Sequence, residues 1–172
     1  DFVDNYGATL LSRKYNGLLQ CLKSIFPNYE WLPWKFTNSL KGFWDNIENQ
    51  KAYMKWLGNK LGYTCMEDWY KISTKDFQYN YGNGLCFSKY NGSAIQTVKV
   101  LFPNYEWLSW KFSHVPQGYW ADIKNQKEYM EWLEKKLGYT STEDWYKISK
   151  QDFVDNYGAG LLNKYNSSSK RC

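Results

Sequence analysis

The sequence has little of what enzymes commonly use for chemistry. It contains one histidine, His114, and none of the glycine-rich patterns that cradle nucleotide phosphates. Its four cysteines, at positions 21, 65, 86 and 172, have no close pair spacing, so neither a disulfide framework nor a zinc site is predicted. We therefore expect no enzyme activity, no cofactor and no metal, and reduced cysteines in an intracellular protein.

Long apolar runs and alternating strand patterns are also missing. No segment approaches the roughly 20 consecutive apolar residues of a membrane-spanning helix, so no membrane partner is expected. Aromatic residues make up 20% of the chain, with 10 Trp and 16 Tyr, while the mean hydropathy is -0.72. The apolar material is thus concentrated in rings, and the formal charge of +5 is compatible with a polyanionic partner.

The sequence repeats itself. Residues 26–74 align with residues 102–150 at an offset of about 76 positions, and about two-thirds of the aligned residues are identical. The opening residues 1–17 return as residues 76–92 and again as residues 152–166. Internal repetition on this scale is typical of arrays of small structural units.

This periodicity sets the expected domain organisation. We divide the chain into repeat 1 (residues 1–74, starting within a unit), repeat 2 (residues 75–150) and the truncated opening of a third repeat (residues 151–172). Because the chain opens inside one repeat and stops inside another, we expect it to be part of a longer protein, whose other domains are then partners.

The local signals within a repeat are helical. An apolar stripe from Tyr53 to Leu61 predicts a long helix, with Asn49 as its N-cap and Gly62 as its stop. Capping boxes are expected to open two short helices, the first between Thr64 and Glu67 and the second between Ser73 and Asp76, with equivalents in the next copy.

A glycine turn, a short helix ending in Lys-Tyr-Asn and a further helix follow the second box. The predicted fold class is therefore all-α, built as tandem helical repeats of about 76 residues that each contain a helix-turn-helix-like unit.

The aromatic motif FPNYEWLPWKF occupies residues 26–36 and returns, with one substitution, at residues 102–112. Its rings can form a stacking surface for bases, or they can be the packing joint between one unit and the next. Because the rings stay nearly fixed while the flanking residues change, we interpret the motif as a joint. Within it, Lys35 and Lys111 are the candidates for contacting a ligand.

The basic residues are informative when the copies are compared. On the long helix, Lys55 becomes Glu131, so this face is not expected to meet phosphate in every unit. Lysines recur at three other places, which are the Lys-Tyr-Asn segments, the helix after them and the aromatic motif: Lys14, Lys89 and Lys164, then Lys23 and Lys99, then Lys35 and Lys111.

A helix-turn-helix arrangement would place the short helix over residues 8–15 into a major groove, with free amides near Asn91 and Ser93 receiving a phosphate. Fixed lysines would position the module, and variable neighbours would read bases. The predicted nucleic-acid-binding residues are Thr9, Ser12, Arg13, Lys14, Asn16, Lys23, Lys35, Asn83, Ser88, Lys89, Asn91, Ser93, Lys99, Lys111 and Lys164.

Three motifs together resemble a known family. They are the helix end Lys60-Leu61-Gly62, the Ser-x-x-Asp-Phe helix start and the pattern L-x-x-x-Y-N-G-S-x-x-x-x-x-K, read loosely over residues 85–99. The unit resembles the homing endonuclease-associated repeat, a small helical DNA-binding module found beside HNH and related nucleases. The resemblance covers about 50 residues of each unit. The added aromatic segments look like those of an aromatic-rich tandem variant in uncharacterised eukaryotic and viral proteins.

The resemblance implies that the array targets a longer protein to double-stranded DNA, with Arg13, Lys14, Ser88, Lys89 and Lys164 near the duplex. The predicted function is therefore a modular DNA-binding array, and a nuclear location is compatible with it. Two alternatives stay open. One is an α-solenoid scaffold for another protein, and the other is binding of single-stranded RNA by stacking on the tryptophan-rich motif.

Overall fold

The computed structural model describes residues 17–36 and 42–168. The helices in order are α2 (Leu18–Ile25), η2 (Pro33–Lys35), η3 (Phe43–Asp45), α3 (Ile47–Leu61), η4 (Met66–Lys71), α4 (Thr74–Tyr79), η5 (Gly84–Lys89), α5 (Ala94–Leu101), η6 (Ser109–Lys111), η7 (Tyr119–Ala121), α6 (Ile123–Leu137), η8 (Thr142–Lys147), α7 (Lys150–Asp155) and α8 (Ala159–Ser168). The η elements are 3-10 helices, except that η5 is a π-helix.

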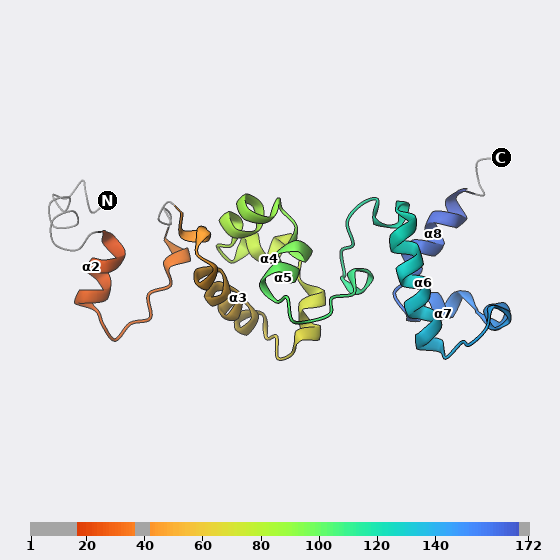
Figure 1. Ribbon diagram of the computed structural model, residues 1–172. Coiled ribbons are helices and arrows are strands. Elements are labelled where there is room, and N and C mark those ends of the chain that lie inside the picture. Colours follow the sequence, from red (N-terminus) through yellow and green to blue (C-terminus); the bar gives the residue numbers. More distant parts are fainter. Residues whose placement is uncertain (1–16, 37–41, 169–172) are drawn as a thin grey trace.

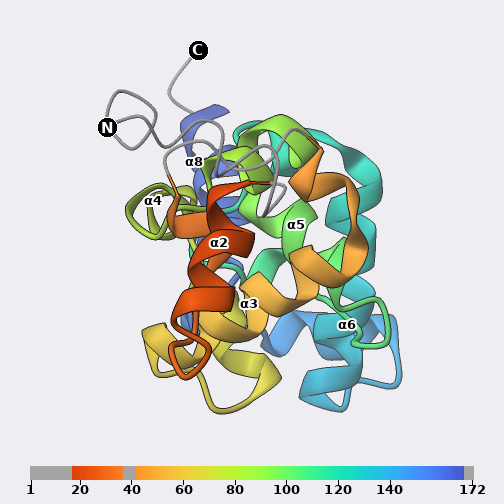
Figure 2. The same ribbon diagram turned by 90° about the vertical axis from the view of Figure 1, so that its left-hand side faces the viewer.

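The all-α prediction is confirmed, since the described residues contain helices and no strand. The helices follow one another along an extended path from α2 to α8 (Figure 1), and Figure 2 shows the same elements from the N-terminal side. In the part of the chain that the structure describes, no helix is long and apolar enough to cross a lipid bilayer.

The two long helices, α3 and α6, have 15 residues each and begin in the same way. Asn46 caps α3 and Asp122 caps α6, and each side chain accepts a hydrogen bond from the backbone amide two residues further on, at 2.8 Å and 2.9 Å. The prediction of Asn49 as the cap is wrong, because α3 begins at Ile47 and Asn49 lies within its first turn, where its side-chain amide donates to the Phe43 carbonyl at 2.9 Å. The predicted stop at Gly62 is confirmed by its left-handed φ of 74°.

The first predicted capping box is displaced by one residue. Instead of Thr64 with Glu67, the box that opens η4 pairs Cys65 with Asp68, whose Oδ2 accepts from the amides of Thr64 at 2.9 Å and Cys65 at 3.3 Å. The hydrogen bond from Lys71 and those from the two amides hold the pKa of the Asp68 carboxyl well below its usual range. This carboxylate therefore organises the turn between α3 and η4.

The second predicted box is confirmed in both copies. Ser73 and Asp76 exchange backbone and side-chain hydrogen bonds at the start of α4, and Ser149 and Asp152 do so at the start of α7. The backbone donors bond at 2.8 Å and 2.7 Å to the aspartate oxygens. Local sequence thus fixes where these short helices begin.

The core consists of two buried clusters, each built around a fully buried tyrosine. The first cluster runs from Trp34 to Phe112 around Tyr53, and the second runs from Trp110 to Leu161 around Tyr129. The Tyr53 hydroxyl donates to the Asn80 carbonyl at 3.0 Å, and the Tyr129 hydroxyl donates to that of Asn156 at 3.1 Å. Ring centroids of Trp34, Trp44 and Phe77 lie 5.3–6.2 Å from that of Tyr53, and those of Trp110, Trp120 and Phe153 lie 5.3–6.1 Å from that of Tyr129.

These tyrosines explain the glycine of each predicted turn. A Cβ atom at Gly82 would lie 2.2 Å from the Tyr53 hydroxyl oxygen, and one at Gly158 would lie 2.1 Å from that of Tyr129. Because both rings are fully buried and hydrogen-bonded, they cannot move aside at low cost. Any larger residue is excluded by packing against the long helix.

Residues 102–112 connect the two clusters. Near their middle, the Tyr70 hydroxyl accepts a hydrogen bond from the Leu108 amide at 3.0 Å, and the Phe112 ring lies 4.8 Å from that of Tyr70, in the first cluster. Trp110, by contrast, packs 5.5 Å from Tyr129 in the second cluster. These contacts support the interpretation of the motif as a packing joint. The first cluster also contains residues from both sides of residue 74, so the boundary of the packed cluster does not coincide with the boundary of the sequence repeat.

The unfolding free energy is expected to fall as the pH rises from about 10 to about 12. Burial raises the pKa of Tyr129 from 10.0 to about 12, so its phenol stays protonated in the folded chain where it ionises in the unfolded chain. The stabilisation is complete below pH 10, and about 2 to 3 kcal/mol of it is lost as the pH reaches 12. Urea unfolding across this range tests the slope, and Tyr129→Phe should flatten it. An identical slope in that variant would contradict the assignment.

Candidate nucleic-acid interface

The predicted helix-turn-helix region is formed by α4, η5 and α5. The chain leaves α4 through Tyr81, which has a left-handed φ of 64°, and enters η5. Leu85 in η5 is buried, while Asn83, Ser88 and Lys89 are exposed. The structure therefore brings three predicted site residues to solvent on one short helix.

The π-helical form of η5 is explained by one extra residue and by a contact with a distant part of the chain. The segment 82–90 is one residue longer than the equivalent segment 158–165. Both segments nevertheless end in the same contact, in which a tyrosine hydroxyl donates a hydrogen bond of 2.6 Å to a glutamine of the long helix: Tyr90 to Gln50 and Tyr165 to Gln126. With both ends held, the extra residue widens the helix, whereas α8 is an ordinary α-helix. The exposed positions of η5 and α8 are consequently displayed differently.

The Lys-Tyr-Asn segment ends a helix in one copy and not in the other. After η5, Asn91 and Gly92 take left-handed conformations with φ of 52° and 73° and separate it from α5. In the third copy the helix does not end at this segment, because α8 continues through Asn166 to Ser168. The glycine that makes the turn after Asn91 is replaced by Ser167.

Two of the three predicted phosphate-binding amides already donate hydrogen bonds within the fold. The Gly92 amide donates to the Cys86 carbonyl and the Ser93 amide donates to the Tyr90 carbonyl, both at 2.9 Å. The Ser93 hydroxyl accepts from the Gln96 amide at 3.1 Å and so caps α5. The prediction that the amides at Asn91 to Ser93 are all free is wrong at these two positions.

Two of the recurring lysines have partners within the fold. Lys89 forms an ion pair with Asp45 of η3. The Lys99 ammonium donates to the Ser109 hydroxyl at 2.6 Å, and burial lowers its pKa. Lys99 thus tethers α5 to the aromatic joint.

The other lysines of the predicted set differ in their surroundings. Lys23 is exposed in the last turn of α2, and the Lys35 ammonium lies 5.7 Å from the centroid of the Trp56 ring. Lys164 lies on α8 with its ammonium 5.5 Å from the Tyr165 ring centroid. The predicted residues Thr9, Ser12, Arg13, Lys14 and Asn16 lie outside the described residues.

Lys111 lies where three elements meet. Its ammonium is 5.6 Å from the Tyr70 ring centroid, 5.9 Å from that of Trp132 and 5.8 Å from that of Tyr157. These rings come from η4, from α6 and from the turn between α7 and α8. Such cation–π contacts stabilise the arrangement of the two clusters around the joint.

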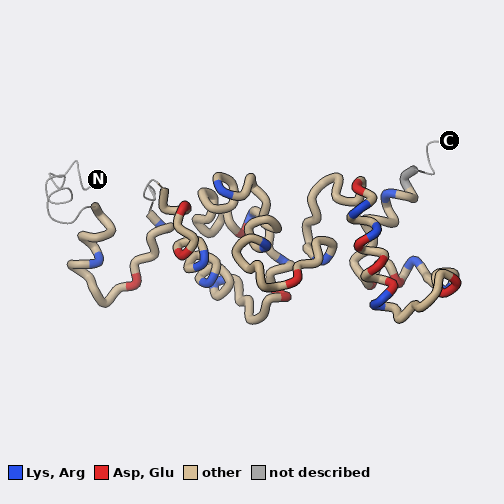
Figure 3. The backbone as a smooth tube through the Cα atoms, viewed as in Figure 1, with Lys and Arg blue, Asp and Glu red and all other residues tan. Residues whose placement is uncertain are grey.

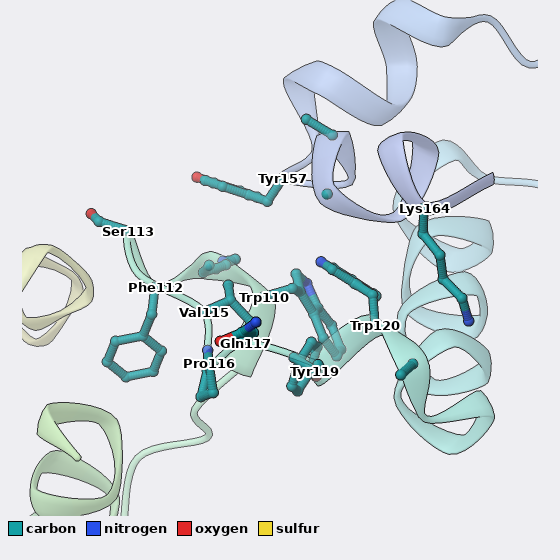
Figure 4. Close-up of a pocket in the computed structure, with 15 residues that line it drawn as sticks. Trp110, Phe112, Ser113, Val115, Pro116, Gln117, Tyr119, Trp120, Tyr157 and Lys164 are labelled. Carbon is teal, nitrogen blue, oxygen red and sulfur yellow. The ribbon is translucent and has the colours of Figure 1, made fainter. Parts of the chain in front are cut away.

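A cavity of about 780 Å³, which we call the aromatic cleft, lies between residues 110–121 and residues 157–164. Figure 4 shows Tyr157 entering from the turn before α8, opposite Trp110, Tyr119 and Trp120 of the joint and η7. Lys111 and Lys164, both predicted site residues, line the same cleft. No acidic residue is among the described residues that line it.

A second cavity, of about 560 Å³, lies at the starts of α4 and α5. Lys75 and His114 line this second cavity. Pro116 lines both cavities, so the two cavities adjoin the loop that contains it. Sequence comparison passed over both residues, because Lys75 is matched by Gln151 and His114 by Asn38 in the other copies. The fold places both residues in the lining of one cavity, and a comparison of the repeated sequences cannot reveal this.

The long helices carry charges of both signs. Figure 3 shows acidic and basic residues interleaved along α6, where Lys124 forms an ion pair with Glu128 at 3.9 Å. A mixed surface of this kind attracts phosphate weakly. No group of three metal-ligating side chains is present among residues 17–36 and 42–168.

Comparison with family models, with curated proteins and with solved structures found no match for this chain. The resemblance to homing endonuclease-associated repeats therefore stays a prediction based on the sequence motifs.

Proposed function

We propose that the chain is a modular array of helical repeats of about 76 residues that binds double-stranded DNA and targets a larger protein to it. The observation that carries this proposal is the arrangement of α4, η5 and α5. In it, a short helix is anchored by Leu85 and Tyr90 and leaves Asn83, Ser88 and Lys89 exposed. A short exposed helix held between two others is the geometry with which helix-turn-helix proteins enter a major groove.

The sequence variation supports a division of labour on this helix. Asn83 and Ser88 differ from their counterparts in the other copies, while the lysine of the Lys-Tyr-Asn segment recurs as Lys14, Lys89 and Lys164. Contacts to phosphate position a protein on the duplex, and contacts to base edges specify the sequence. The recurring lysines are assigned the first role and the variable polar residues the second.

Replacing Lys14, Lys89 and Lys164 together by alanine is expected to flatten the dependence of duplex affinity on salt. Each lost phosphate contact should reduce the slope of log K against log salt by about 0.9, so the triple variant should lose about 2 to 3 units. Fluorescence anisotropy of a labelled duplex over a series of salt concentrations measures this slope.

The matched control replaces three exposed lysines of α6, Lys127, Lys135 and Lys136, and so removes the same charge from the mixed surface. This control should keep the slope of the unchanged protein. If both triple variants behave alike, the proposed face is wrong, and if the unchanged protein shows no salt-dependent duplex binding, the proposed function fails.

A further inference from the structure

The ring of Tyr70 lies in a set of side chains that the joint at residues 102–112 provides. Its centroid is 4.8 Å from that of Phe112, 5.2 Å from that of Trp107 and 6.4 Å from that of Tyr105. Its hydroxyl accepts a hydrogen bond from the Leu108 amide at 3.0 Å. We call the residues around this ring the second tyrosine socket, and they are Tyr105, Trp107, Leu108, Lys111 and Phe112.

The first joint carries the same socket around an open cavity of about 130 Å³. The counterparts of the five socket residues, each 76 positions earlier, line this cavity, and we call them the first tyrosine socket: Tyr29, Trp31, Leu32, Lys35 and Phe36. Among the described residues, these three rings contact only one another and Phe26.

The first socket already has nearly the form of the occupied one. The Trp31 ring lies 4.7 Å from that of Tyr29 and 6.2 Å from that of Phe36, and the matching distances in the second socket are 4.4 Å and 5.6 Å. A site that is formed before its occupant enters loses little conformational freedom on binding. The first socket is therefore ready to receive a tyrosine.

A matching tyrosine is exposed on η8. Tyr146 stands at the position of Tyr70 and is 87% exposed. Its ring and hydroxyl have no ring contact or hydrogen bond among residues 17–36 and 42–168. An exposed aromatic side chain that is buried in the equivalent unit marks a surface from which a partner is missing.

Two contacts that flank the occupied socket can be repeated in the same way. Trp69 packs with its ring centroid 5.1 Å from that of Phe102, and the Tyr105 hydroxyl donates to Glu67 at 2.6 Å. The counterparts of these four residues are accessible, since Phe26, Tyr29 and Glu143 are exposed and Trp145 is half-buried. Both faces of the internal contact thus occur a second time without each other.

The exposed tyrosine and the open socket lie at opposite ends of the chain. Figure 1 shows α2, which the first joint follows, at one end, and α6 and α7, which flank η8, at the other. One copy therefore cannot bring its own Tyr146 to its own first socket, but a second copy can. Such a contact joins two different surfaces, so each added copy leaves a socket and a tyrosine exposed for the next.

We propose that copies of this protein associate head to tail, with Tyr146 of one copy inserted into the first tyrosine socket of the next. The Leu32 amide, which has no acceptor among the described residues, donates to the Tyr146 hydroxyl, and Phe26 packs against Trp145. The occupant is a second copy because the same two surfaces already contact each other within the chain. This association goes beyond duplex binding and does not depend on it.

Sedimentation velocity of the 172-residue protein without DNA, over a series of protein concentrations, tests the proposal. The mean mass should grow past that of a dimer as the concentration rises, and Tyr146→Ala should weaken association by about tenfold or more. The matched control is Tyr79→Ala, which removes a 77% exposed tyrosine of α4 and should leave association unchanged. A protein that stays monomeric at millimolar concentration would overturn the proposal, and equal weakening by Tyr79→Ala would overturn the role of Tyr146.

A mixing experiment tests the direction of the contact. Tyr29→Ala removes one wall of the first socket and keeps Tyr146, whereas Tyr146→Ala keeps the socket, so each variant alone should be mainly monomeric. Their equimolar mixture should form dimers that grow no further, because the intact socket of one variant receives the intact tyrosine of the other. If Tyr29→Ala alone associates like the unchanged protein, or if the mixture forms no dimer, the head-to-tail contact is wrong.

Discussion

Replacing Tyr70 by alanine is expected to lower the unfolding free energy by about 3 to 5 kcal/mol, while the same change at Tyr146 should shift it by less than about 0.5 kcal/mol. The two tyrosines occupy equivalent positions of the repeat, yet Tyr70 is 8% exposed and Tyr146 is 87% exposed. Tyr70 accepts a hydrogen bond from the Leu108 amide, packs against Phe112, and its carbonyl accepts from the Ser113 amide at 2.9 Å. Urea unfolding of both variants measures the difference.

The conservative change Tyr70→Phe separates packing from hydrogen bonding. It keeps the ring among the aromatic residues of the joint but leaves the Leu108 amide without its acceptor, so a loss of about 1 to 3 kcal/mol is expected. If Tyr70→Ala proves no more destabilising than Tyr146→Ala, then the joint contributes nothing to stability and the connection between the clusters must be sought elsewhere.

The second large effect concerns Tyr129. Changing it to alanine removes a fully buried ring that contacts Trp110, Trp120 and Phe153, and should cost about 3 to 5 kcal/mol. Proteins of this kind are stable by only about 5 to 15 kcal/mol in total. The second cluster has fewer buried residues than the first, so most of its stability should be lost.

Hydrogen exchange shows which part of the chain opens in this variant. Amides of α6, α7 and α8 should lose protection, while those of α3, α4 and α5 keep it, because those helices pack in the first cluster. The control Tyr129→Phe removes one hydrogen bond to the Asn156 carbonyl and should cost about 1 kcal/mol. A uniform loss of protection in Tyr129→Ala would instead show that the two clusters unfold as one cooperative unit.

Much of the secondary structure follows from local sequence, and the errors have physical causes. The boxes at Ser73 and Ser149 and the stop at Gly62 are predictable because each depends on a few adjacent residues. Several polar residues could cap α3, and the cap is Asn46 because the helix begins at Ile47, which leaves Asn49 inside the first turn. The π-helical form of η5 depends on the distant Gln50, which no local pattern reveals.

The candidate site is less accessible from the sequence. Comparison of the copies picks out Lys89 and Lys111, but their partners come from segments far along the chain, such as Asp45, 44 positions away from Lys89. The contacts of Lys111 with rings of three elements depend on how the helices pack, and so does the presence of Lys75 and His114 in the lining of one cavity. Comparison of the copies therefore identifies side chains that recur in the repeat. Only the fold shows whether such a side chain stabilises the chain or faces a ligand.

The contacts of Tyr70 with the joint also bear on how the protein responds to a pulling force. Tension along the extended chain passes from the first cluster to the second through residues 102–113, since these residues pack in both. Tyr70 holds this segment through two hydrogen bonds, one from the Leu108 amide and one from the Ser113 amide. Both hydrogen bonds and the ring contacts between them therefore bear the pulling force. Because these contacts act on one short segment, we expect them to break together when the chain is pulled.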